Sequence, residues 1–138
     1  MSYTKHADNI LLSATPDDTL EAFRLDSGTQ VLGVCISHTA HASSTTSYPA
    51  FRVYWTVPDV GEVLATVRNT TPSISAGEAS LSEYDGIVLC KDLTDSDGTV
   101  GRARTYDIHP GATHVRLEPY EAGDTVNPGR TTIWLGRA

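Results

Sequence analysis

Residues Phe51–Val57 read FRVYWTV, and this short stretch decides the fold class. Large apolar side chains alternate along it with polar or amphipathic ones, which puts Phe51, Val53, Trp55 and Val57 together and sets Arg52, Tyr54 and Thr56 apart from them. Successive side chains of a strand point to opposite faces, so the alternation predicts a β-strand with one face in a core. The turn PDVG (Pro58–Gly61) and the return segment Glu62–Asn69 complete a predicted β-hairpin.

Six further segments outside this hairpin have the length and composition of strands. Gln30–Ser37 and Tyr84–Leu93 contain nearly continuous apolar runs, and the other four are Leu20–Leu25, Arg102–Ile108, His114–Tyr120 and Thr131–Arg137. About eight strands separated by turn signals predict an all-β, antiparallel β-sandwich, with an eight-stranded jelly roll favoured over an immunoglobulin-like sandwich.

The ends of the chain receive different predictions. Residues 1–18 are expected to form an extended N-terminal arm, and residues 19–138 a single sandwich domain. The best helix candidate, His6–Ala14, is too short to carry a fold. The last strand, Thr131–Arg137, is apolar on both faces at its centre, so we expect it to close the sandwich, with Trp134 joining Trp55 in the core.

Composition narrows the function classes. The 138 residues carry a formal net charge of −7, and only Lys5 and Lys91 are lysines. A nucleic-acid surface needs clustered Lys and Arg, so we expect no nucleic-acid partner and no anionic membrane partner. The N-terminus lacks the pattern of a signal peptide, and no apolar run approaches the ~20 residues of a transmembrane helix.

No catalytic or metal-binding signature stands out. Cys35 and Cys90 lie in apolar segments, which favours two reduced cysteines over a disulfide. His38 and His41 begin a polar loop, His38–Ala50, where we expect both to be solvated. We therefore predict no cofactor, no metal and no enzymatic activity.

Acidic residues suggest two sites that we weigh against simpler interpretations. Asp92, Asp95 and Asp97 precede Gly98 and resemble a calcium loop, but Arg104 stands where such a loop needs a glutamate. An ordinary Asp-Gly hairpin turn is therefore favoured. Glu118 and Glu121 could form a carboxylate pair of the glycosidase type, although solvated acids are the simpler interpretation.

Contact surfaces are the remaining candidates. Tyr54 shares its predicted outward face with Arg52, and aromatic residues beside arginine are typical of interface hot spots. The arm and two Ser/Thr-rich loops, His38–Ala50 and Thr70–Ser80, are expected to order against neighbouring subunits. The predicted interface residues are Tyr3, His6, Ile10, Leu11, Leu12, Tyr48, Arg52 and Tyr54.

The predicted arm, the FRVYWTV hairpin and the ending PYEAGDTVNPGRTTIWLG together resemble the small β-sandwich virion proteins of tailed bacteriophages, in particular capsid decoration (cement) proteins and related head or tail accessory domains. The resemblance is one of architecture. It implies a non-enzymatic protein of the virion, assembled in the host cytoplasm, that binds the major capsid protein or other virion subunits as a homo-oligomer, typically a trimer.

Two other interpretations remain open at this stage. A carbohydrate- or receptor-binding module on the same fold would place aromatic and acidic residues on one rim, around Tyr84, Asp95 and Asp97. A cupin-like metal enzyme would need histidines converging inside a barrel, whereas the histidines here fall mostly in predicted turns.

Overall fold

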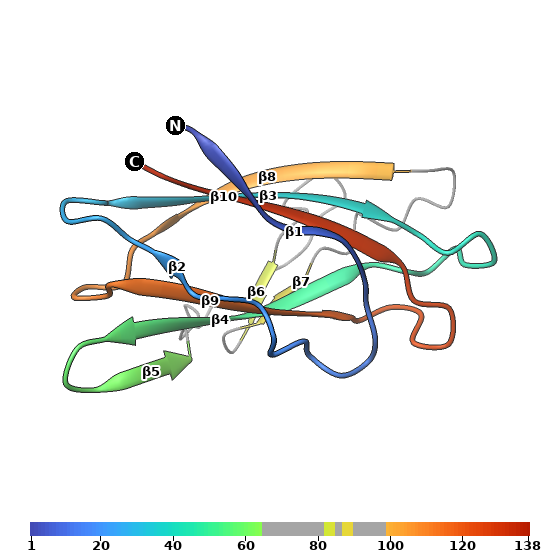
Figure 1. Ribbon diagram of the computed structural model, residues 1–138. Coiled ribbons are helices and arrows are strands. Elements are labelled where there is room, and N and C mark those ends of the chain that lie inside the picture. Colours follow the sequence, from blue (N-terminus) through green and yellow to red (C-terminus); the bar gives the residue numbers. More distant parts are fainter. Residues whose placement is uncertain (65–81, 85–86, 90–98) are drawn as a thin grey trace.

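The chain forms two antiparallel β-sheets stacked face to face (Figure 1). The structure is a computed structural model that describes residues 1–64, 82–84, 87–89 and 99–138, with side chains described for 1–64 and 105–138. Among these residues there is no helix that is long and apolar enough to cross a membrane. Four predictions fall outside the described residues or side chains: Cys90, the Asp92–Asp97 turn, the second Ser/Thr loop and the Tyr84 rim.

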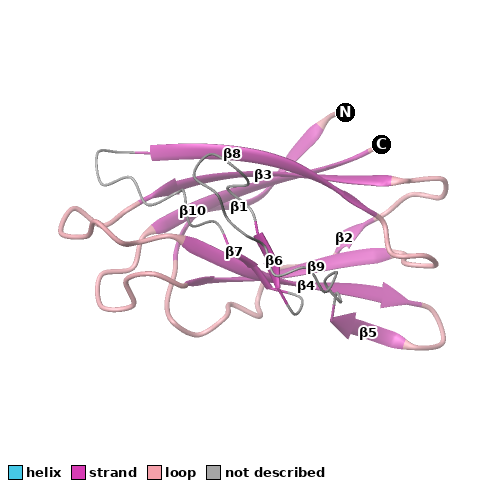
Figure 2. Cartoon of the chain, turned by 180° about the vertical axis from the view of Figure 1, so that it is seen from behind, coloured by secondary structure: helices cyan, strands magenta, loops and turns pink. Residues whose placement is uncertain are grey.

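The first sheet, called sheet A here, has four strands in the order β1-β10-β3-β8. Its two central strands, β10 and β3, pair along eight residues, and β3 pairs with β8 along nine. Strands β1 and β8 form its edges (Figure 2). The bounds are β1 Tyr3–Leu11, β3 Val31–Thr39, β8 Thr99–Asp107 and β10 Arg130–Arg137.

The second sheet, sheet B, has the order β2-β9-β4-β7-β6. Strand β4, which contains the FRVYWTV stretch, pairs along one edge with β9 and along the other with β7 and then β5. The bounds are β2 Phe23–Arg24, β4 Pro49–Val57, β5 Gly61–Leu64, β6 Ser82–Tyr84, β7 Ile87–Leu89 and β9 His114–Glu121.

The β-sandwich prediction is confirmed, and period-two patterning explains it. In β4, Phe51, Val53 and Trp55 are at most 7% exposed, whereas Arg52 and Tyr54 are only half-buried. The inner faces of both sheets contribute to one apolar core. Each buried Val, Leu, Ile or Phe in such a core stabilises the fold by about 1.5–3 kcal/mol. The clustered buried residues are Ala7, Leu25, Leu32, Val34, Ile36, Phe51, Val53, Trp55, Val115, Leu117, Ile133 and Leu135.

The chain alternates between the sheets. It passes from β1 in sheet A to β2 in sheet B, returns to A for β3, and continues through β4–β7 in B, β8 in A, β9 in B and β10 in A. Loops at one end of the sandwich join β1 to β2, β3 to β4 and β9 to β10. The loops β2–β3, β4–β5 and β8–β9 lie at the other end (Figure 1).

The predicted N-terminal arm is not confirmed. Residues Tyr3–Leu11 form β1, which pairs antiparallel with β10, and the helix candidate at His6–Ala14 is wrong for the same reason. The pairing shifts register between Lys5 and Ala7 and again between Ala7 and Ile10. These irregularities break the apolar alternation, which is why the sequence did not indicate a strand.

The closing role of the last strand is confirmed, but the placement of its tryptophan is wrong. Strand β10 lies between β1 and β3, with Ile133 and Leu135 fully buried in the core. Trp134 points to the outer face of sheet A, where it is half-buried. Lys5 Nζ lies 6.0 Å from the centroid of its ring. Because Ile133 and Leu135 occupy the inner face, the period of two sends Trp134 outward.

Candidate functional site

A buried polar cluster holds together the loops at one end of the sandwich. It consists of His38, Ser47, Glu121 and Thr131, none more than 1% exposed. His38 and Thr131 face each other in the β3–β10 register, Ser47 precedes β4, and Glu121 ends β9. Both sheets therefore contribute to this group, which we call the Glu121 cluster.

The Glu121 carboxylate accepts five hydrogen bonds. Its Oε1 accepts from the Ser47 hydroxyl at 2.5 Å and from the Gly129 N–H at 2.9 Å. Its Oε2 accepts from three backbone N–H groups, those of Tyr48 (2.9 Å), Gly123 (3.0 Å) and Asp124 (3.2 Å). A buried charge is tolerated only when it is paired or hydrogen-bonded in this way. One carboxylate thus fixes the β3–β4 and β9–β10 loops.

The direction of the hydrogen bonds argues against a nucleophilic serine. Ser47 donates its only hydroxyl proton to Glu121, so its oxygen must accept from His38 Nε2 at 2.8 Å. His38 Nδ1 then accepts from the Thr131 hydroxyl at 2.7 Å. Burial lowers the pKa of His38, against an opposing effect of the Glu121 charge, which keeps the ring neutral. In a catalytic serine the proton would instead pass to the histidine.

Two glycines in the β9–β10 loop make room for this cluster. A Cβ on Gly129 would lie 2.6 Å from His38 Cε1 and 2.7 Å from the Thr39 carbonyl oxygen. A Cβ on Gly123 would overlap the Thr46 carbonyl oxygen and approach the Tyr48 ring to 2.6 Å. These glycines are required for close backbone approach, since neither has a positive φ.

The acidic pair suggested by the sequence is divided between two environments. Both residues are buried, Glu121 at 1% exposure and Glu118 at 8%, so the prediction that they are solvated is wrong. Along β9 the inner positions hold Leu117 and Glu121, and the outer positions hold Arg116 and Glu118. The two carboxylates therefore lie on opposite faces of sheet B, which rules out a shared reaction centre of the glycosidase type.

An ion-pair network occupies the outer face of sheet B. Arg116 binds Glu62 through two nitrogens, at 2.7 and 3.1 Å, and Glu118 at 2.6 Å. These bonds lower the pKa of Glu62 and raise that of Arg116. The guanidinium also lies 4.6 Å from the centre of the Tyr54 ring. Because Arg116 covers Tyr54, this ring is not an open platform for stacking a ligand.

The predicted interface residues do not form one surface. The N-terminal ones belong to sheet A or the segment after it, whereas Tyr48, Arg52 and Tyr54 are half-buried in or beside sheet B. Leu12 is 2% exposed and belongs to the interior, so its assignment to a surface is wrong. Tyr3 and Leu11 are exposed, at 40% and 60%.

His6 and Ile10 point toward the space between the sheets. Ile10 packs against the core. The His6 ring meets Phe23 of β2 edge to face with centroids 6.1 Å apart, and its buried Nε2 has no hydrogen-bond partner. Burial lowers the pKa of His6, which a hydrogen bond to the Glu21 backbone partly opposes.

The histidine and cysteine predictions have mixed outcomes. His41 is exposed as expected, but His38 is buried because β3 extends through Thr39. Cys35 is a free thiol, half-buried on the outer face of sheet A opposite Trp134. Among the described residues, no group of three or more His, Cys, Asp or Glu side chains is placed to hold a metal ion.

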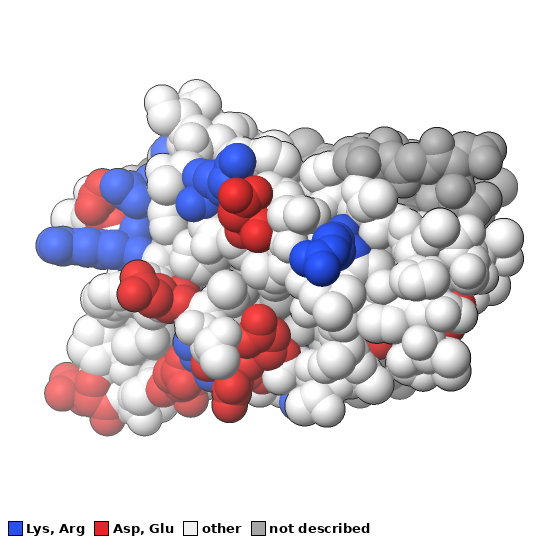
Figure 3. Space-filling model, turned by 45° about the vertical axis from the view of Figure 1, so that its right-hand side comes forward, with Lys and Arg blue, Asp and Glu red and all other residues white. Residues whose placement is uncertain are grey.

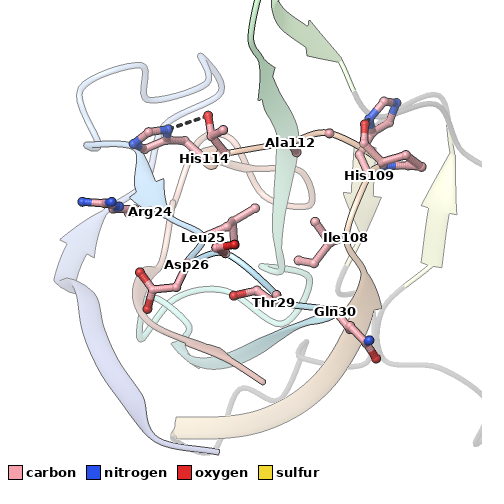
Figure 4. A pocket seen from close by; sticks show the side chains of 14 residues that line it. Arg24, Leu25, Asp26, Thr29, Gln30, Ile108, His109, Ala112 and His114 are labelled. Atoms are coloured by element: carbon pink, nitrogen blue, oxygen red, sulfur yellow. Dashed lines mark hydrogen bonds between the residues drawn. The ribbon is translucent and has the colours of Figure 1, made fainter.

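A cleft of about 800 Å³ opens at the other end of the sandwich. Its walls are the β2–β3 loop, residues 25–30, and the β8–β9 loop, residues 108–113, with Arg24 and His114 at the margin (Figure 4). Sequence reasoning identified both loops only as turns, because their proximity depends on the pairing of sheets A and B. We call this feature the end cleft.

Comparisons of the chain with protein-family models, with curated proteins and with solved structures found no match.

Proposed function

We propose that this chain is a non-enzymatic structural protein of a bacteriophage virion, of the decoration type that binds the outer capsid surface and stabilises the shell as an oligomer. The observation that carries this proposal is the strand order, β1-β10-β3-β8 against β2-β9-β4-β7-β6. This order, with the chain alternating between sheets, is what a jelly roll produces, and we infer that connectivity here. Jelly rolls are common in viral capsid and lectin domains and in cupins.

The filled interior of the sandwich counts against the cupin class. A cupin-type enzyme keeps a metal-binding cavity inside its fold, whereas the space between these sheets is filled by apolar side chains such as Phe51, Leu117 and Ile133, all at most 1% exposed. The buried polar groups of the Glu121 cluster hold the loops in place through hydrogen bonds. A filled apolar core with rigidly held loops is suited to a structural subunit of an assembly.

Labelling of particles would test the proposal. An antibody against the purified chain is applied to virions released by the organism that encodes it, followed by gold-conjugated secondary antibody and electron microscopy. We expect regular labelling over the head. Labelling confined to a tail tip, together with binding on a glycan array, would favour the receptor-binding alternative, and unlabelled particles would refute a place in the virion.

A further inference from the structure

The end cleft is a preformed socket with rigid walls. Each wall is a four-residue turn closed by a backbone hydrogen bond, from Thr29 N to Asp26 O (2.9 Å) and from Ala112 N to His109 O (3.0 Å). Both turns have glycine with positive φ at the third position, Gly28 (86°) and Gly111 (81°). Pro110 precedes Gly111, which is the sequence preference of a type II turn.

Two further backbone hydrogen bonds tie the walls together. Leu25 N donates to Thr113 O at 2.8 Å, and Ile108 N donates to Gln30 O at 3.2 Å. The cleft therefore lies within a ring of backbone that is fixed at both sides. A preformed site of this kind binds its occupant without first ordering its own loops.

The centre of the cleft is aliphatic and its charges lie at the margin. Leu25 and Ile108 extend toward the centre together with Thr29, while Arg24 and Asp26 extend away from it (Figure 4). Asp26 is already bound to Arg137 at 2.7 Å. The occupant should thus present a small apolar group to the centre and polar groups to the rim.

The opposite end of the same molecule displays such a group. Val126 is 85% exposed at the tip of the β9–β10 loop, the most exposed of the large apolar residues in the described part of the chain. The tip is held in shape, because Asp124 Oδ1 accepts hydrogen bonds from Val126 N (3.2 Å) and Asn127 N (2.9 Å). The Glu121 cluster fixes the base of this loop.

We propose that Val126 of one copy inserts into the end cleft of a second copy, packing against Ile108 and the edge of Leu25, whose side chain is otherwise part of the core. A cleft of about 800 Å³ is larger than one side chain, so the polar neighbours Thr125 and Asn127 enter with the valine and meet the rim. Charge supports this orientation. Among the described residues Arg24 forms no ion pair within its own copy. The Asp124 carboxylate is half-buried and already bonded to Ser44 and to two backbone N–H groups, so it would approach Arg24 of the other copy through its remaining acceptor positions.

The surface around Val126 suits burial against a neighbour. Figure 3 shows that charged side chains gather over one part of the visible face and leave the rest mostly uncharged. The loops beside Val126, residues 40–48 and 122–129, contain Asp124 as their one Asp, Glu, Lys or Arg. Few charges would therefore have to be desolvated there.

The Val126 loop tip, called the knob here, and the end cleft lie at opposite ends of the molecule, so the contact is head to tail. Such a heterologous contact closes into a ring when its rotation allows, and otherwise extends as an open chain. The net charge of −7 opposes it at low salt, so association should strengthen as ionic strength rises. The inference deepens the proposed structural role by naming a surface for self-assembly, but its test needs no capsid.

Sedimentation velocity of the purified chain tests the contact, with protein from about 10 µM to about 1 mM at moderate salt, the range in which weak association is seen. We expect concentration-dependent oligomers. Val126→Asp should weaken association about 10- to 100-fold through the lost burial of one valine. The control is Leu64→Asp, which changes another exposed apolar residue (41%), in strand β5 rather than in a loop at either end, and should associate like the wild type.

Mixing two variants gives the sharper result. Thr29→Arg blocks the cleft and leaves the knob, whereas Val126→Asp removes the knob and leaves the cleft. At a concentration where each variant alone is monomeric, an equimolar mixture should form dimers and nothing larger, because only one functional contact remains. If Thr29→Arg does not fold, Ser27→Arg on the exposed wall replaces it. Three results would overturn the proposal: a wild type that is monomeric at all concentrations, a Val126→Asp variant that associates normally, or a mixture of the two variants without dimers. Particle labelling would still test the virion role separately.

Discussion

Replacing Glu121 by glutamine should destabilise the protein strongly without changing the volume of the side chain. The carboxylate accepts four backbone N–H bonds and one from Ser47, all in a site only 1% exposed. A neutral amide has one acceptor oxygen, and its NH₂ group would face N–H donors. At least two donors would lose their partner, each costing about 1–3 kcal/mol. The expected loss for two such donors is therefore about 2–6 kcal/mol.

Urea unfolding followed by tryptophan fluorescence would measure this loss, because Trp55 is buried in the core. The midpoint should fall while the slope stays unchanged, since the area exposed on unfolding is the same. A domain of this class has a total stability of about 5–15 kcal/mol, so the variant would be marginal.

Glu62→Gln is the matched control. This carboxylate also binds an arginine, but its side chain is 43% exposed, and exposed ion pairs contribute about 0–1 kcal/mol. A loss below about 1 kcal/mol for Glu121→Gln, equal to the control, would refute the conclusion that the carboxylate organises the two loops.

Three other outcomes are expected. Burial lowers the pKa of His6 and His38 below the ordinary value of 6.5, so the unfolded chain binds more protons than the folded chain near and below that pH, and stability should fall as the pH drops from 7 to 5. His6→Leu should flatten this stability profile when urea titrations are repeated across the pH range. An unchanged profile would count against a buried, neutral His6. Trp55→Ala should cost about 3–5 kcal/mol in the same assay and Trp134→Ala clearly less, and equal losses would contradict the outward position of Trp134. Gly123→Ala should lower the unfolding free energy by about 1–3 kcal/mol, because its Cβ meets a backbone carbonyl that cannot move aside; a neutral effect would argue against the close loop packing.

Local patterning in the sequence was enough to predict the sandwich, because most strands carry either a period-two alternation or a short apolar run bounded by turn residues. Strand β4 runs from Pro49 to Val57, close to the Phe51–Val57 prediction, and β9 and β10 differ from their predicted bounds by one residue. Strand β1 was missed because two register shifts hide its period. Its pairing partner, β10, lies more than a hundred residues away in the chain, beyond the reach of local reasoning.

The buried cluster and the end cleft could not be predicted because each depends on distant segments meeting. Glu121 and Ser47 are 74 residues apart, and a glutamate beside Gly123 and Asp124 looks like an ordinary polar turn. The one available signal was the spacing of Gly123 and Gly129 around a loop that starts at Glu121, which is compatible with backbone packing closely around a side chain. The orientation of Trp134 could have been read from the period of two, since Ile133 and Leu135 made an equally good inner face.

The stability of particles tests the proposed function most directly. Virions from a strain in which the gene is deleted are heated, with and without added purified chain, and genome release is followed with a DNA-binding dye. The decoration role predicts that deletion particles release DNA at a lower temperature and that added protein binds them and restores the original temperature. Particles that release DNA at the same temperature with or without the gene, and that bind none of the added chain, would contradict it.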